Sequence, residues 1–391
     1  MQKEKHSPQT KIVTSGRNKD WNKGVVNTPV YRASTVLFDT LDEMYHAVKS
    51  GAENKLSYGR RGTPTHFSFQ EAIAELEGGF ATALYPSGAA AISCSLLSFL
   101  SSGDHLLMVD SVYEPTRKFC ETILKDLNIE TTYYDPLIGS KIESLIRPNT
   151  KIVFLESPGS LTMEVQDVPS ICNIAHRHNL LTFLDNTWAS PLNCRPFEMG
   201  IDVSIQAATK YIVGHSDVMM GTATTTEALW DRLKARSYAL GQCVSPDDAY
   251  LAHRGLRTLA VRMKQHEKSA IEIATWLQQR SEVDHVRHPA FESCPGHEFF
   301  KRDFSASNGL FSFVLKDVTK TQLKQFVEDM TLFKMGFSWG GYESLIIPAF
   351  NLSKIRSATS WPTSNVVIRL HIGLEDPKDL IADLTNAFLR L

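Results

Sequence analysis

A short apolar strand runs directly into a lysine in the stretch Val203-Ser-Ile-Gln-Ala-Ala-Thr-Lys210-Tyr-Ile-Val-Gly-His-Ser216. Most lysines are solvated surface charges. Lys210 instead follows a predicted buried strand and small residues, and it precedes a Gly-His-Ser loop. We therefore expect its ammonium group to be partly desolvated and its pKa to be lowered. A lysine of this kind can form a Schiff base with a carbonyl compound.

The strand before Lys210 belongs to a longer series. Between about residues 80 and 225, short apolar runs alternate with helical patterns, which is typical of a βαβ architecture around a mostly parallel sheet. In such sheets ligands bind beyond the carboxyl ends of the strands. The predicted strands are Ala81–Tyr85, His105–Asp110, Thr131–Tyr134, Lys151–Leu155, Leu181–Asp185, Val203–Ala207 and Met220–Thr224.

Two further features lie at predicted strand ends. Pro86-Ser-Gly-Ala89 opens a helix with small residues, and free backbone N–H groups there would form a phosphate cradle. Asp185 ends an apolar strand and could hold a proton on a heteroaromatic nitrogen, orient a histidine or bind a metal. Taken singly, the first could be a structural turn and the second a helix cap. Together with Lys210 they supply the three groups that pyridoxal phosphate needs.

Composition excludes several other classes of protein. The 391 residues carry a formal net charge of −2, which gives no electrostatic reason to expect a nucleic acid or an anionic membrane as partner. Six scattered cysteines without a C-x-x-C motif indicate neither a disulfide framework nor a zinc site, and we predict no metal. Since no apolar stretch approaches the ~18–20 residues of a membrane span, we expect a soluble, cytoplasmic protein.

The chain divides into three predicted parts. Residues 1–60 read as an N-terminal arm with one helical stretch at Leu41–Val48, and residues 61–255 as the large cofactor domain. Residues 256–391 read as a smaller α/β domain, entered through a long amphipathic pattern over Tyr250–Arg280. The remaining predicted elements of this smaller domain are Gly309–Leu315, Thr321–Asp329, Leu332–Met335, Val366–Ile372 and Pro377–Leu389.

The stretch Asp202–Ser216 resembles the lysine signature of the Cys/Met-metabolism family of fold-type I pyridoxal phosphate enzymes, which contains the cystathionine lyases and synthases. The likeness runs nearly end to end. It implies an α/β fold with a mostly parallel seven-stranded sheet in the large domain and a smaller α/β C-terminal domain. The other matching motifs are Tyr58-Gly-Arg-Arg-Gly-Thr-Pro-Thr65, Glu75-Leu-Glu-Gly78, Pro86-Ser-Gly88, Tyr113-Glu-Pro115, Glu156-Ser-Pro-Gly-Ser160, Leu184-Asp-Asn-Thr-Trp188, Arg254-Gly-Leu-Arg-Thr-Leu259, Ser338-Trp-Gly-Gly-Tyr-Glu-Ser344 and Ile368-Arg-Leu-His-Ile-Gly-Leu-Glu-Asp376.

The resemblance also assigns roles around the cofactor. Lys210 would form the Schiff base and move the Cα proton, Asp185 would keep the pyridine nitrogen protonated, and Tyr113 would stack on the ring. A simple packed aromatic remains the alternative for Tyr113. The phosphate would be held by Gly88, Ala89 and Thr209, joined by Tyr58 and Arg60 from a neighbouring subunit. Ala207 stands where many relatives have serine, so one phosphate hydrogen bond is absent or replaced.

For the substrate, the resemblance places the α-carboxylate on Arg369 and makes Ser338 and Trp339 part of the same pocket. Tyr238 would contact the distal end of the substrate or be a packed tyrosine. Because Tyr58 and Arg60 would come from a neighbour, a homodimer is the smallest active unit, and a homotetramer is usual in the family.

The implied activity is that of a carbon–sulfur lyase in methionine biosynthesis. It would split cystathionine by α,β-elimination into homocysteine, pyruvate and ammonia. The bulky residues Trp339 and Tyr342 favour β- over γ-chemistry, as does the absence of a cysteine from Tyr113-Glu-Pro115, where methionine γ-lyases have one nearby. The alternatives are a cystathionine γ-lyase or γ-synthase, a β-lyase of broad specificity for cysteine S-conjugates, and a non-catalytic regulator with the same fold. A regulator should have lost Lys210 or Asp185, and both are present.

Overall fold

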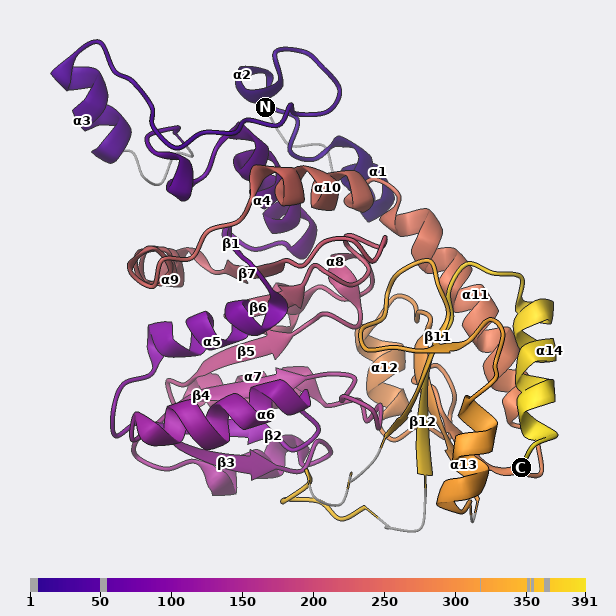
Figure 1. Cartoon of the computed structure of the whole chain (residues 1–391). Coiled ribbons are helices and arrows are strands. Elements are labelled where there is room, and N and C mark those ends of the chain that lie inside the picture. The colour runs from indigo at the N-terminus through magenta and orange to yellow at the C-terminus, as the bar shows by residue number, and fades with distance from the viewer. Residues whose placement is uncertain (1–5, 50–54, 317, 350–351, 353–354, 362–365) are drawn as a thin grey trace.

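Seven strands form the larger of two sheets in the computed structural model, in the order β1-β7-β6-β5-β4-β2-β3 (Figure 1). The structure describes residues 6–49, 55–316, 318–349, 352, 355–361 and 366–391. All seven predicted strands are confirmed, each with its ends within one residue of the expected ones. They are β1 Ala81–Tyr85, β2 His105–Val109, β3 Glu130–Tyr134, β4 Thr150–Glu156, β5 Leu181–Asp185, β6 Val203–Ala207 and β7 Gly221–Thr225.

The sheet is mostly parallel, as predicted, and one strand reverses. β7 pairs antiparallel with both of its neighbours, β1 and β6. The reason lies in the connection 208–220, which contains no crossover helix, so the chain returns beside β6 in the opposite direction. Lys210 lies in this connection, immediately beyond the carboxyl end of β6.

Helices cover this sheet, and its inner strands are buried on both faces. Every residue of β2 and β7 is buried, the pattern of a strand covered on both sides. The helices that follow or precede the strands are α4 Pro64–Glu77, α5 Gly88–Phe99, α6 Glu114–Phe119, η2 Cys120–Leu124, η3 Gly139–Leu145, α7 Val168–Arg177, α8 Ser190–Asn193, η4 Pro196–Met199 and α9 Glu227–Ala239. This covering leaves the strand ends as the accessible edge of the sheet.

A second, five-stranded sheet has the order β10-β11-β12-β9-β8. Its strands β9 Leu310–Leu315, β10 Lys334–Met335 and β12 Val366–His371 lie within predicted runs. Two strands, β8 Val283–Arg287 and β11 Leu345–Ala349, were not predicted. Only Val283 and Val286 of β8 are buried, and β11 contains Pro348, which disfavours a strand. The accompanying helices are α12 His297–Asp303, α13 Lys320–Val327 and α14 Pro377–Phe388.

The amphipathic pattern over Tyr250–Arg280 is two helices rather than one. α10 covers Pro246–Leu256 and α11 covers Leu259–Leu277. The Arg257 guanidinium lies at the break and donates hydrogen bonds to the carbonyl oxygens of Ile12, at 2.6 Å, and Ser15, at 2.9 Å. The hydrogen bonds of Arg257 therefore attach the chain to the N-terminal segment at this break. After it, α11 runs on to the smaller sheet and lies beside α14 (Figure 1).

The N-terminal segment is only partly packed on this body. Ile12, in α1 Pro8–Thr14, is buried in the hydrophobic cluster that also contains Tyr211 and Ile212. After α2 Lys19–Asn22, the chain leads to α3 Leu41–Lys49, which projects away from the sheets (Figure 1). Leu37 is 89% exposed there. This geometry suits an arm, and the limits 1–60, 61–255 and 256–391 remain our proposal for the domains.

The smaller domain depends on a buried carboxylate that gives a stability test. Asp383 of α14 accepts hydrogen bonds from the backbone amides of Thr331, Leu332 and Phe333, at 2.8 to 2.9 Å. Burial alone would raise the pKa of Asp383, but these hydrogen bonds outweigh it and the pKa is lowered. The ionised carboxylate therefore stabilises the fold above the ordinary Asp pKa of about 4, and this contribution is lost as the pH falls through the lower folded-state pKa.

We expect Asp383→Asn to lower the free energy of unfolding at pH 7 by about 1–3 kcal/mol, because buried amides lose a charged acceptor. Urea denaturation followed by circular dichroism measures it. The matched control is Asp379→Asn, an exposed position of the same helix, where the cost should be a few tenths of a kcal/mol. The difference between Asp383→Asn and the parent should shrink below about pH 4. Equal losses for the two variants would contradict the assignment.

Candidate active site

Lys210 is held between the two sheets. Its Nζ donates a hydrogen bond to Ser338 Oγ at 2.7 Å and lies 5.5 Å from the centre of the Trp339 ring. Burial and the positive charge of Arg369 lower the pKa of Lys210 to about 8, against the opposing charge of Asp185. The expectation of a desolvated lysine thus has a physical basis: near neutral pH a useful fraction of this amine is unprotonated and nucleophilic.

Asp185, the last residue of β5, is fixed by its neighbours. Its Oδ1 accepts hydrogen bonds from the backbone amide of Thr187 at 3.0 Å and from the Thr187 hydroxyl at 2.5 Å. The same hydroxyl oxygen accepts the backbone amide of Ala207 at 2.8 Å, which links β5 to β6. Burial raises the pKa of Asp185. Asp185 is not a helix cap, since the next helix, α8, has Ala189 at its N-cap.

The amino end of α5 forms the predicted cradle. Ser87 caps the helix by accepting the Ala90 amide at 3.1 Å. Within the part of the chain that the structure describes, the amides of Gly88 and Ala89 donate no hydrogen bond. A Cβ atom on Gly88 would lie 2.5 Å from that of Ala207, so only glycine allows this close approach to β6. Two free amides at a helix N-terminus are suited to a phosphate.

Thr209 lies beside this cradle in the loop between β6 and β7. Its hydroxyl accepts the backbone amide of Met220 at 2.9 Å and lies 3.2 Å from the Met220 carbonyl oxygen. These contacts hold the hydroxyl in place one residue before Lys210. Ala207 has no such group, and Thr209 remains our proposal for a hydroxyl of this loop that contacts the phosphate.

Tyr113 is the N-cap residue of α6, and its position depends on a residue to which the sequence analysis assigned no role. Its backbone amide donates to Glu156 Oε2 at 2.8 Å. Glu156 ends β4 and lies in register with Asp185 of β5. Burial and the charge of Asp185 raise the pKa of Glu156 well above its ordinary value. Glu156 had the same signal as Asp185, a carboxylate at the end of a buried strand.

Arg369 of β12 completes the group around Lys210. Its Nη2 donates to the backbone carbonyl of Ser338 at 3.0 Å, the residue whose hydroxyl accepts Lys210. Burial lowers the pKa of Arg369 to about 10, and the phenol of Tyr113 opposes the shift. No ion pair with a carboxylate forms here among the described residues. A partly buried guanidinium without a carboxylate partner is suited to an anionic ligand.

An aromatic stack supports the loop that carries Ser338. The Tyr211 ring lies 5.4 Å from the Trp339 ring and 5.8 Å from the His371 ring, both in edge contact. His371 Nε2 is 3.1 Å from the carbonyl oxygen of Gly341. Gly340 has a φ of +87°, and a Cβ there would lie 2.8 Å from the carbonyl carbon of Lys210. The loop therefore lies directly on the backbone of the lysine.

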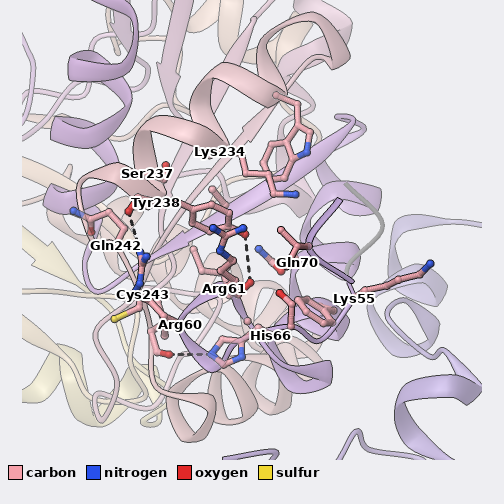
Figure 2. A pocket seen from close by; sticks show the side chains of 18 of the residues that line it. Lys55, Arg60, Arg61, His66, Gln70, Lys234, Ser237, Tyr238, Gln242 and Cys243 are labelled. Carbon is pink, nitrogen blue, oxygen red and sulfur yellow. Dashed lines mark hydrogen bonds between the residues drawn. The ribbon is translucent and has the colours of Figure 1, made fainter. Parts of the chain in front are cut away.

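Tyr238 and Arg60 lie together in a different cavity (Figure 2). Arg60 Nη1 donates to the Tyr238 carbonyl at 2.9 Å, and the Arg61 guanidinium lies 5.3 Å from the Tyr238 ring centre. Tyr58 precedes η1 Gly59–Arg61 and is 45% exposed. Lys210 and the residues around it do not line this cavity. Within one chain, the structure thus places Arg60 and Tyr238 in a cavity that Lys210, Asp185 and Arg369 do not line.

The comparisons with known proteins agree with this geometry. Residues 9–389 match the family model described as Cys/Met metabolism PLP-dependent enzyme. The chain belongs to this family. It is 49% identical over 387 residues to a cystathionine beta-lyase of Escherichia coli, and 48% identical over 387 residues to one of Salmonella typhimurium, with 98% of each chain covered in both cases. A solved cystathionine gamma-lyase from Lactobacillus plantarum is 30% identical, with a TM-score of 0.89 over 98% of this chain and 99% of that chain.

Family membership confirms a pyridoxal phosphate-dependent enzyme of amino-acid metabolism with the fold-type I architecture. The residues present fit this cofactor: two unbonded helix amides for a phosphate, a buried carboxylate whose second oxygen is unbonded among the described residues, and a lysine of lowered pKa. The described residues contain no cluster of three or more possible metal ligands. No helix among them has the length and apolar character that a membrane crossing requires.

The lowered pKa of Lys210 predicts how the cofactor-free protein captures pyridoxal phosphate. The unprotonated amine is the nucleophile, so the capture rate should fall by about tenfold per pH unit below pH 8 and level off above it. Stopped-flow absorbance of the violet band that borohydride abolishes measures the rate.

Arg369→Met provides the comparison. Removing the positive charge should raise the pKa of Lys210 and move the midpoint of the profile to higher pH, because Arg369 is one of the two causes of the lowered value. Lys210→Ala should show no such band at any pH. A midpoint that stays unchanged in Arg369→Met would show that Arg369 does not act on this amine.

Proposed function

We propose that this protein catalyses the α,β-elimination of cystathionine to homocysteine, pyruvate and ammonia, a carbon–sulfur lyase step of methionine biosynthesis. The names of its relatives support the reaction class. The observation that carries the proposal is the placement of Lys210 between Ser338 and Trp339, with Arg369 bonded to the same loop.

Different side chains bind the substrate, hold the cofactor ring and transfer protons. Pyridoxal phosphate, when bound, supplies an electron sink for the pair left at Cα. Arg369 binds the substrate α-carboxylate, which orients the amino acid with its Cα toward Lys210. Lys210 removes the Cα proton, and Asp185 keeps the cofactor ring nitrogen protonated. Tyr113, whose phenol is near Arg369, is placed for proton transfer to the leaving sulfur or from the substrate amine.

The position of Lys210 favours β-elimination over the γ-reactions. A γ-elimination or γ-replacement requires a second proton to be removed from Cβ, so the lysine must travel along the substrate. Here the Nζ atom is hydrogen-bonded to Ser338 and lies over the Trp339 ring, and the backbone of Gly340 lies against that of the lysine. These contacts favour a short path to Cα. The alternatives are a cystathionine γ-lyase or γ-synthase and a β-lyase of broad specificity for cysteine S-conjugates, with the non-catalytic regulator ranked below them.

The products of cystathionine decide between β- and γ-chemistry. We expect homocysteine and pyruvate in equal amounts, identified by mass spectrometry of the derivatised thiol and by a lactate dehydrogenase assay. Lys210→Ala is the control and should release neither. Cysteine with 2-oxobutyrate would refute the β-assignment. Cystine assayed beside cystathionine distinguishes a dedicated enzyme from one of broad specificity.

We also propose that the active unit is a homodimer, and that two dimers form a tetramer. Arg60 lines a cavity that Lys210 does not line, yet the family resemblance assigns Tyr58 and Arg60 to the phosphate. Arg60 lines the same cavity as Ala47 and Val48 of α3, the helix that projects away from the sheets (Figure 1), which is consistent with a contribution to a neighbouring subunit. A cytoplasmic location is supported by six free cysteines, five of them buried.

A mixing experiment tests the shared site. Lys210→Ala and the double variant Tyr58→Ala/Arg60→Ala should each be nearly inactive. When the two are refolded together, half of the dimers are hybrids with one intact site each, so up to about a quarter of the parent activity should return. In the control, Lys210→Ala is mixed with Asp185→Asn, whose lesion lies on the same side of the site as Lys210. Each site of a hybrid then keeps one lesion, so this mixture should recover no activity.

The decisive comparison uses one chain with all three changes, Tyr58→Ala/Arg60→Ala/Lys210→Ala, mixed with the parent. Every hybrid then has a lesion in both of its sites, so activity should fall below the simple dilution of the parent. Activity equal to dilution, together with no recovery in the first mixture, would contradict a site shared between subunits.

A further inference from the structure

The connection between β11 and β12 crosses from the smaller sheet to the larger one. We call its residues 355–361 the strap. The strap contacts Asp110, which follows β2 at the carboxyl edge of the larger sheet and is 1% exposed. The two segments are about 250 residues apart in sequence, since the pair Thr359 and Asp110 has a separation of 249. The contact therefore joins the two sheets directly.

Asp110 accepts six hydrogen bonds, five of them from the strap. Oδ1 accepts the Ser357 amide at 3.0 Å, the Ser357 hydroxyl at 3.2 Å and Arg117 Nη2 at 2.6 Å. Oδ2 accepts the amides of Ala358 and Thr359 at 3.2 and 2.9 Å, and the Thr359 hydroxyl at 2.7 Å. Three consecutive amides converge on one buried carboxylate, which fixes the strap backbone as an anion fixes a nest.

Further contacts hold the strap on both sides. Arg356 contacts the Thr162 hydroxyl and lies 3.7 Å from the carboxylate of Glu164, both in the loop after β4. The Trp361 ring lies 4.6 Å from the Arg287 guanidinium of β8. Ile355 and Trp361 also pack on a hydrophobic cluster formed by Val314, Val367 and Leu352.

These contacts connect the strap with two segments that carry active-site residues, β12 and the turn before α6. Val367 and Arg369 are two residues apart on β12, so their side chains lie on the same face of the strand. The strap thus packs on the position next to Arg369. On the other side, Asp110 is three residues before Tyr113, in the turn that leads into α6. Asp110 is therefore the point at which the strand carrying Arg369 is attached to the turn carrying Tyr113.

We propose that Asp110 is a positioning residue which, through the strap, holds Arg369 at the correct place for the substrate α-carboxylate. The inference rests on the proposed function only in taking an amino acid as the ligand. Asp110 touches neither substrate nor cofactor in this scheme. Its effect is on the affinity for the α-carboxylate, while the attachment of the cofactor to Lys210 is independent of it.

An ionised carboxylate suits this role better than its amide. Burial would raise the pKa of Asp110, but the hydrogen bonds from Ser357, Thr359 and Arg117 outweigh it, and the pKa is lowered. Asparagine would keep one acceptor oxygen and turn an NH₂ group toward strap amides that are themselves donors. The amides at one of the two oxygens would then lose their acceptor.

The test measures ligand affinity and strap exchange separately. In the pyridoxal phosphate-loaded Asp110→Asn variant, the dissociation constant of glycine, followed by the change in cofactor absorbance, should rise about tenfold. Hydrogen exchange of the amides of residues 357–359 should become at least about tenfold faster. The violet band and its loss with borohydride should be those of the parent. Glycine has an α-carboxylate and no leaving group, so this result does not depend on cystathionine being the substrate.

Two further variants make the result decisive. Asp104→Asn, at the other end of β2, removes an acceptor of one amide, that of Ser101, and should leave glycine affinity and strap exchange unchanged. Ser357→Ala/Thr359→Val removes two hydroxyl donors to Asp110 and keeps the carboxylate, so it should weaken glycine binding by a smaller factor. This double variant decides the case if Asp110→Asn does not fold.

Three outcomes would overturn the proposal. Parent-like glycine affinity with faster strap exchange would show that the strap does not position Arg369. Unchanged exchange would show that Asp110 does not hold the strap. A loss of the cofactor band in both Asp110→Asn and Ser357→Ala/Thr359→Val would indicate a general structural defect instead. If glycine behaves as expected but cystathionine is not cleaved, the proposed function fails and the positioning role stands.

Discussion

The hydrogen bond between Lys210 and Ser338 is the interaction on which the active site depends. It joins the loop beyond β6 of the larger sheet to a loop of the smaller domain, over a separation of 128 residues. Arg369 is bonded to the backbone of the same serine, so the reactive amine and the anion-binding guanidinium share one support. The two positive groups are close enough for Arg369 to lower the pKa of Lys210. Anchoring the substrate and activating the lysine are thus consequences of the same packing.

The larger sheet explains why the other groups meet there. β4, β5 and β6 are parallel neighbours, so Glu156, Asp185 and Lys210 emerge at one edge. Glu156 and Asp185 lie side by side in register, and Asp185 is linked to β6 through Thr187. Two buried carboxyl groups at this spacing do not readily ionise together. Burial and the charge of Asp185 raise the pKa of Glu156 well above its ordinary value, whereas Asp185 is the member of the pair whose oxygen accepts hydrogen bonds from Thr187.

The sequence was sufficient for the larger sheet, and it singled out Asp185, Lys210 and Arg369 before their positions were known. The strands are short runs of apolar, β-branched or aromatic residues, and Asp185 and Lys210 have a signal that depends only on local order. The smaller sheet was harder, because Pro348 in β11 and the polar residues of β8 conceal strands that only pairing with β12 and β9 stabilises. The contact of Lys210 with Ser338 and that of Asp110 with the strap could not be predicted, since they arise from packing between segments far apart in the chain.

The order of these segments along the chain has a consequence for biosynthesis. The cradle at Gly88, Asp185 and Lys210 are all made before residue 211, whereas Ser338 and Arg369 are among the last residues to be made. A domain can fold on the ribosome as it emerges. A nascent large domain would therefore already contain Gly88, Asp185 and Lys210. It would still lack Arg369, whose charge lowers the pKa of Lys210. The pKa of Lys210 therefore reaches its final, lowered value only after the C-terminal part has been made and has folded against the large domain.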